Sequence, residues 1–252
     1  YDGLKEAGET DIISLTRAAY PGSQKYGAAV WNGDIVSDWR ALRQSVTSGL
    51  SMAMCGIPWW NSDIGGFLHG DTENEEFREL MVRWFQFGLF SPIMRLHGDR
   101  KRTKDQPNPH PELMCKSGGP NEIWCFGEEN YETLKSLIKT RERLKPYTIK
   151  YMDIASKTGS PIMRPMLYDF YEDEICYTLE DQYMYGGDIL FAPIMEKGQV
   201  ERKVYLPEGN WISVIDKKTY CGKQWLNVHA DLHQYIAFVK EGSDVLDVFN
   251  LS

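Results

Sequence analysis

The first 159 residues alternate short apolar runs with segments of helical periodicity, and no other feature constrains the fold as strongly. Helices are expected at residues 37–48, which Gly49 can end, and at residues 75–88, which carry an apolar stripe along one side. Strand-like apolar runs flank these segments at residues 12–17, 26–31, 51–58 and 92–97. Such an alternation is typical of parallel strands joined by crossover helices.

A polar residue lies near the end of each expected strand or in the turn after it: Arg17, Asp34, Asp63 and His97. The carboxyl ends of parallel strands meet at one edge of a sheet, so these four side chains are expected to lie close together. In a (β/α)8 barrel that edge carries the active site. Four strand–helix units amount to half of such a barrel.

A long helix and a set of short strands are expected in the rest of the chain. Residues 128–157 have helical periodicity, with a break expected near Pro146. Short β-like runs then follow at residues 188–193, 202–207, 220–225, 232–239 and 244–249. Strands at this spacing predict a small antiparallel β-sandwich. The predicted fold is therefore α/β followed by all-β, with one domain at residues 1–159 and a second at residues 160–252.

Composition argues against several classes of function. The net charge of −8 argues against a nucleic-acid partner, and the longest basic run, residues 97–104, is expected to be a solvated loop. The five cysteines are widely spaced and form no C-x-x-C pair, which argues against zinc and favours a reducing compartment such as the cytoplasm. No apolar run reaches the roughly 20 residues of a membrane span. No glycine-rich phosphate loop is present either.

Two segments place an acidic residue beside tryptophan and glycine: residues 31–34 (Trp-Asn-Gly-Asp) and residues 59–67. An aromatic ring can cover the apolar face of a pyranose, while a carboxylate binds its hydroxyls or transfers a proton. Asp34, partly buried against Trp31, could therefore act as a general acid/base. It could equally cap the helix that begins near residue 37.

The other polar candidates also have two readings each. Asp63 could bind sugar hydroxyls or belong to an ordinary turn at the end of a strand. Arg17 could pair with one of the acids through its planar fork, or form a surface ion pair. His97 could donate to a substrate hydroxyl or be structural. The residues alone leave these alternatives open.

The chain resembles glycoside hydrolase family 31, the α-glucosidases and α-xylosidases, across nearly its whole length. The segments that carry the resemblance are residues 15–17, 31–34, 60–67, 95–98, 186–194 and 204–211. The resemblance implies the C-terminal half of a (β/α)8 TIM barrel, strands five to eight, followed by a β-sandwich. It also implies retaining, exo-acting hydrolysis of a terminal α-linked sugar in an oligosaccharide or α-glycoside, with neither a metal nor an organic cofactor.

Site residues follow from the resemblance position by position. The matching acid/base is Asp34. Side chains that would contact sugar hydroxyls are Arg17, Asp63 and His97, and the aromatic residues that would wall the subsite are Trp31 and Phe67.

One element of the family pattern has no match. The nucleophilic aspartate near the end of the fourth barrel strand is expected upstream of Tyr1, together with the N-terminal half of the barrel. A retaining glycosidase needs two carboxyl groups roughly 5–5.5 Å apart, so we expect this chain to be inactive alone. The alternatives are a structural scaffold and a non-catalytic sugar-binding module built on Trp211, Trp225 and Tyr235. The sequence does not decide between glucoside and xyloside, nor does it predict an oligomeric state.

Overall fold

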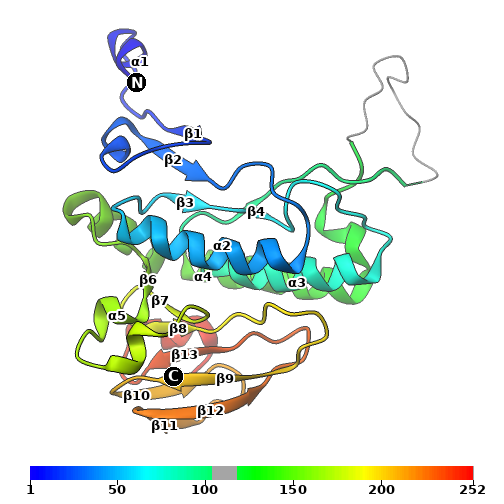
Figure 1. Cartoon of the computed structure of the whole chain (residues 1–252), viewed down its shortest axis with the longest axis vertical. Helices are drawn as coiled ribbons and strands as arrows, with labels where there is room; N and C mark the ends of the chain where they lie inside the picture. The colour runs from blue at the N-terminus through cyan, green and yellow to red at the C-terminus, as the bar shows by residue number, and fades with distance from the viewer. Residues whose placement is uncertain (104–117, 252) are drawn as a thin grey trace.

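Short parallel strands form the first layer of the computed structural model, which describes residues 1–103 and 118–251 (Figure 1). They follow a short helix, α1 (Asp2–Glu6), and the 3-10 helix η1 (Ser23–Tyr26) lies among them. The strands pair in chain order: β1 (Ser14–Thr16), β2 (Ala28–Trp31) and β3 (Trp60–Asn61) in one sheet, and β4 (Asp63–Ile64) and β5 (Arg95–Leu96) in another. Only Ser62 separates β3 from β4, so the carboxyl ends of all of them share one edge.

Three long helices lie between these strands and the antiparallel sheets of the second half (Figure 1). They are α2 (Trp39–Met54), α3 (Glu75–Leu89) and α4 (Glu128–Thr158), and the 3-10 helix η3 (Ile123–Phe126) precedes α4. The side chain of Asp38 accepts a hydrogen bond from the Ala41 N–H (2.7 Å) and caps α2, as Asn74 caps α3. The described helices contain none long and apolar enough to cross a membrane.

The expected strand at residues 51–58 is wrong, because α2 continues to Met54 and the strand begins only at Trp60. Gly49 does not end the helix. It is buried within it, and a Cβ atom there would lie 2.8 Å from the Trp60 ring. The glycine therefore serves close packing of α2 on β3. A second correction concerns α4, which runs through Pro146 without a break.

The second half contains two antiparallel sheets. The six-stranded sheet has the order β11 (Thr219–Cys221), β10 (Asn210–Ser213), β13 (Ala237–Lys240), β8 (Ile189–Phe191), β7 (Tyr183–Tyr185), β6 (Met163–Pro165). The two-stranded sheet pairs β9 (Glu201–Leu206) with β12 (Gln224–His229). The second half also contains the short helices α5 (Met166–Asp169), η4 (Glu174–Tyr177) and η5 (Asp244–Phe249). Residues 244–249 were expected as a strand, which is wrong: they form η5 and pack Val245 and Phe249 into the core.

The six-stranded sheet is buried on both faces. Tyr183 and Tyr185 of β7 point into a core shared with the long helices, whereas Met184 between them points into a second core with β9 and β10. A buried arginine also joins the halves: Arg83 of α3 donates to backbone carbonyl oxygens of Gln199, Ala230, Asp231 and Gln234 at 3.0–3.2 Å. Apolar packing and these hydrogen bonds therefore hold the long helices, and with them the parallel strands, to the second half.

Candidate active site

The carboxyl ends of the parallel strands bring together the six side chains that the sequence predicts for the site. Arg17 follows β1 directly, Trp31 ends β2, and Asp34 lies three residues further on. Asp63 is part of β4, with Phe67 in the turn after it, and His97 follows β5 directly.

Arg17, Trp31 and Asp34 form the first of two contact groups. The Arg17 guanidinium makes an ion pair with the Asp34 carboxylate and lies 5.7 Å from the centre of the Trp31 ring. Both charged side chains remain open to solvent, Arg17 by 62% and Asp34 by 40%. The cap of α2 is Asp38, so the alternative reading of Asp34 as that cap is wrong. Asp34 is thus an accessible carboxylate held by one arginine.

Asp63, Arg95, Phe67 and His97 form the second group. The fully buried Asp63 carboxylate accepts a hydrogen bond from Arg95 through one oxygen, while its Oδ2 atom has no hydrogen-bond partner among residues 1–103 and 118–251. The ring centres of Phe67 and His97 lie 5.4 Å apart. An aromatic ring and an imidazole therefore lie side by side in this group.

Electrostatics links the two groups. Burial raises the pKa of Asp63, chiefly because the ionised form loses its hydration. The positive charges of Arg95 and His97 oppose that rise, and the negative charge of Asp34 adds to it. Asp34 and His97 are therefore among the groups that act on the Asp63 carboxylate.

Sequence reasoning gave no role to two residues of this region. Arg95 and His97 are two positions apart at the end of a strand, where side chains leave on the same face, and this spacing could have placed Arg95 beside the site. Arg100 lies in the basic run expected as a solvated loop, and that expectation is wrong at this residue, which is only 1% exposed. Its partners are backbone carbonyl groups and the side chains of Asn121 and Ser37, most of them distant in the sequence, which a reading of charges along the chain does not reveal.

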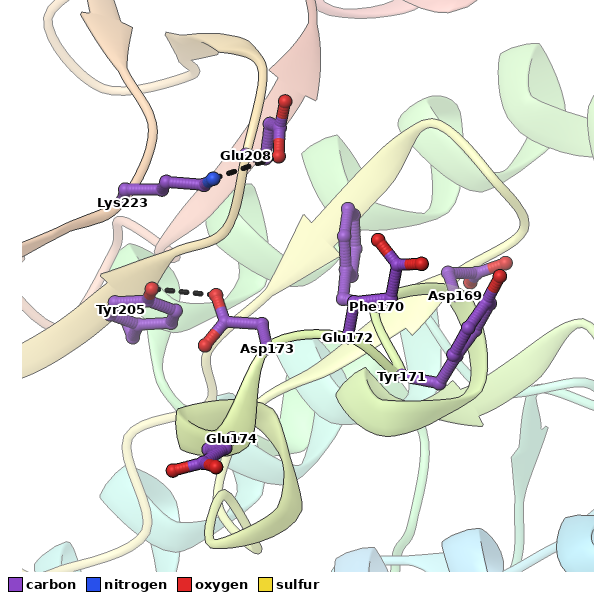
Figure 2. A pocket seen from close by; sticks show the side chains of 9 residues that line it. All are labelled: Asp169, Phe170, Tyr171, Glu172, Asp173, Glu174, Tyr205, Glu208 and Lys223. Atoms are coloured by element: carbon purple, nitrogen blue, oxygen red, sulfur yellow. Dashed lines mark hydrogen bonds and ion pairs between the residues drawn. The ribbon is translucent and has the colours of Figure 1, made fainter.

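A separate cavity of about 630 Å³ lies in the second half, and Figure 2 shows the residues that line it. Its polar groups are already paired in part: Tyr205 donates to Asp173 (2.7 Å), and Lys223 pairs with Glu208 (3.0 Å). Of the aromatic residues proposed for a sugar-binding module, Trp211 is fully buried and so cannot contact a ligand. Trp225 packs on Tyr205, with ring centres 5.2 Å apart. Trp225 nevertheless remains 40% exposed, so of the two tryptophan rings only Trp225 is open to a ligand.

Comparisons with known proteins assign both parts of the chain to one family. The family model for the glycosyl hydrolases family 31 TIM-barrel domain matches residues 1–151, and the model for the family's C-terminal domain matches residues 159–245. The chain belongs to glycoside hydrolase family 31.

Relatives of known name include α-xylosidases and α-glucosidases, and also a sulfoquinovosidase and an isomaltosyltransferase. The α-xylosidase of Saccharolobus solfataricus is 32% identical over 96% of this chain and 31% of its own length. Alpha-glucosidase 2 of Bacillus thermoamyloliquefaciens is 32% identical over 97% of this chain and 28% of its own. The chain therefore spans about a third of the length of the curated relatives it matches.

Solved structures give the same picture. The crystal structure of a family 31 α-xylosidase from a soil metagenome, complexed with xylose, superposes with a TM-score of 0.90 at 44% identity, covering 98% of this chain and 37% of that one. The family 31 dextranase of Flavobacterium johnsoniae, complexed with glucose, superposes with a TM-score of 0.82 at 35% identity, covering 95% and 28%.

Proposed function

We propose that this chain is the C-terminal part of a retaining α-glycosidase that releases a terminal α-linked sugar, with Asp34 as its general acid/base. The observation that carries the proposal is the shared strand edge, where the accessible Asp34 carboxylate lies near a second, buried carboxylate with an unpartnered oxygen. The family relatives with α-xylosidase and α-glucosidase names support the substrate class.

Asp63 is proposed to hold the sugar rather than to react with it. Its carboxylate is buried and bound to Arg95, which leaves Oδ2 to accept a hydrogen bond from a hydroxyl group once the side chains that cover it move aside. A buried acceptor without a donor costs roughly 1–3 kcal/mol, so a sugar hydroxyl placed there recovers free energy on binding. His97 can donate to a neighbouring hydroxyl, and Trp31 and Phe67 offer apolar faces to the ring of the sugar.

Asp34 must carry a proton in order to protonate the leaving oxygen. In this structure the Asp34 carboxylate is occupied by its ion pair with Arg17, so it can face the leaving oxygen only when Arg17 finds another partner. We therefore propose that Arg17 turns from Asp34 to a sugar hydroxyl when substrate binds. After the aglycone leaves, the Asp34 carboxylate takes a proton from the water that releases the sugar.

A retaining mechanism also needs a nucleophilic carboxylate, and Asp63 is too well buried and paired for that role. We propose that the nucleophile comes from the upstream half of the barrel and that this chain is inactive without it. Within the described residues, β1 and β5 each have one unpaired edge. Apolar side chains stand open beside both: Ile13 next to β1 is 81% exposed, and an apolar hollow of about 500 Å³ lies between β5 and α4. These surfaces suit coverage by further barrel strands and helices.

We also propose a domain boundary between residues 159 and 160, followed by a β-sandwich. Gly159 ends α4 in a left-handed conformation, and the two family models meet between residues 151 and 159. The buried core between the six-stranded and two-stranded sheets supports a sandwich.

The test is an assay of the full-length parent protein on aryl α-xylosides, aryl α-glucosides and the corresponding β-anomers. We expect turnover of an α-anomer alone, and proton NMR should show the α-sugar as the first product, as retention requires. Release of the β-sugar first would refute retention. Absence of turnover on every α-glycoside would refute the proposed activity.

A further inference from the structure

The turns that carry the proposed site residues are joined to one another beyond the barrel strands. Isolated parallel bridges connect Val36 with Leu68, and Gly70 with Arg100. We call the three connected segments the loop layer: residues 35–37, 66–70 and 99–101. The layer lies beyond the ends of β2, β4 and β5. It therefore sets how the turns after these strands lie relative to each other.

Arg100 lies at the centre of this layer and is 1% exposed. Its guanidinium donates to the carbonyl oxygens of Gly66 (2.9 Å), Ile64 (3.1 Å) and His97 (3.3 Å). Its Nε atom donates to the Asn121 side chain at 2.7 Å. One side chain therefore binds the turn that follows Asp63, the turn that begins at His97, and the segment that leads into α4.

Glycines make the space that the guanidinium occupies. A Cβ atom would lie 2.3 Å from an Arg100 nitrogen at Gly98, 2.7 Å at Gly70 and 3.0 Å at Gly65. A side chain at any of these three positions would displace the arginine. The three glycines thus leave a space that the Arg100 side chain fills, and a smaller side chain would leave part of it empty.

Arg100 also acts on the site through its charge. Burial lowers its pKa to about 10, so the guanidinium remains positive at neutral pH. Its positive charge in turn opposes the burial-driven rise in the pKa of Asp63. No described carboxylate forms a hydrogen bond with Arg100, so its interaction with Asp63 passes through space. Its hydrogen bonds go to backbone carbonyl groups and to the side chains of Asn121 and Ser37.

We propose that Arg100 is a positioning residue of the active site, which holds the turns of Asp63, Phe67 and His97 in the geometry that binds the sugar. The inference rests on the proposed α-glycosidase function. Without the guanidinium, the buried carbonyl groups of Gly66 and Ile64, the His97 carbonyl group and the Asn121 amide each lose a donor, and the turns must rearrange to find water or each other. Displacement of binding groups by about 1 Å can cost roughly 100-fold in rate.

The experiment compares R100M and R83M in the full-length parent enzyme. Methionine keeps an unbranched stem and removes every donor. Arg83 is the matched control, since it is equally buried, has a pKa also lowered to about 10, and donates to backbone carbonyl groups, but at the contact between α3 and the second half. Both variants should lower the melting temperature.

Only R100M should lower kcat/KM on an aryl α-glycoside, by about 100-fold, at a temperature where both variants are folded by circular dichroism. The same variant should weaken binding of the free monosaccharide. R83M should stay within about threefold of the wild type. Added guanidinium ion, at concentrations that leave the wild type unaffected, should restore part of the activity of R100A, which a general loss of stability would not allow.

The proposal is overturned if R100M stays within about threefold of the wild type, or if R83M loses as much as R100M. Where R100M does not fold, N121A provides the second variant, because it removes one acceptor and leaves the arginine in place. A loss of about fivefold in kcat/KM is expected, and an unchanged value overturns the proposal. An inactive wild type is a different outcome, since it refutes the proposed function itself and the inference with it.

Discussion

Asp63 and Arg95 are register partners in the neighbouring parallel strands β4 and β5, and their side chains meet in an ion pair on the buried carboxylate. The pairing matters because Arg95 is the one donor that the structure describes for Asp63. Removing either partner should therefore have a large and asymmetric effect, because Asp63 is fully buried while Arg95 keeps some contact with solvent.

R95M should cost the full-length protein about 3–5 kcal/mol of unfolding free energy, because it leaves a buried carboxylate without its partner. Chemical denaturation measures the loss. The double variant D63N/R95M serves as control, since it carries no buried charge and should recover part of the stability. A double variant no more stable than R95M would contradict this account.

Stability should fall with rising pH through Asp63. Its pKa is raised in the folded protein, so the folded state holds the proton more tightly than the unfolded chain does. The stabilising contribution is complete below the ordinary carboxyl pKa and is lost as the pH rises through the raised value. D63N lacks this loss. The melting temperature of D63N minus that of the wild type should therefore be more positive at pH 7 than at pH 4. The opposite trend would contradict the raised pKa.

Substitution of Asp34 should reduce catalysis, whereas substitution of Asp38 should reduce stability. D34N should lower turnover of an alkyl α-glycoside by about 10²–10⁴-fold, because the leaving oxygen no longer receives a proton. An α-glycosyl fluoride, whose leaving group needs no proton, should lose far less in the glycosylation step. D38A removes the cap of α2 and should cost about 1 kcal/mol of stability with activity retained. Equal loss on both substrates by D34N would argue against the acid role.

Packing at Gly49 should tolerate no side chain. A Cβ atom there would lie 2.8 Å from the Trp60 ring and 3.1 Å from Met163, so G49A should cost about 1–3 kcal/mol. G3A in α1 is the control, because nothing lies within 4 Å of that position and alanine favours the helix. Thermal unfolding of both variants checks the difference, and equal melting temperatures would disprove the close packing.

The apolar hollow beside β5 should be covered in the parent protein. Ile149 of α4 lines it and is 58% exposed in this chain, whereas Val200 is 42% exposed elsewhere. If upstream barrel elements bury Ile149, I149D should cost the parent about 2 kcal/mol, while V200D should change stability by no more than about 0.5 kcal/mol. Equal effects of the two substitutions would argue against coverage of the hollow.

Local patterns in the sequence predicted the elements whose formation depends on neighbours along the chain. The helix expected at residues 75–88 appears as α3, since its apolar stripe and the Asn74 cap act within a few turns. Likewise, a polar residue after an apolar run was enough to place Asp34 and His97 at one edge, because parallel strands must align their carboxyl ends. Asp63 lies at the same edge, although most of the apolar run expected as its strand belongs to or follows α2.

Other features depended on contacts between distant segments. Gly49 was expected to end a helix, but it lies within α2, and the ring of Trp60, eleven positions later, packs directly against it. Periodicity could not show this, because the partner comes from another element.

The sequence by itself determined the alternation of strands and helices, the edge on which the polar residues gather, and the family to which the chain belongs. Only the tertiary structure decided that Asp38 rather than Asp34 caps α2, that Asp63 takes Arg95 as its partner, and that Arg100 is buried among carbonyl groups. The reason is physical. Propensity and periodicity act over a few residues, whereas the burial and pairing of a charge depend on which distant groups the fold brings within hydrogen-bond distance.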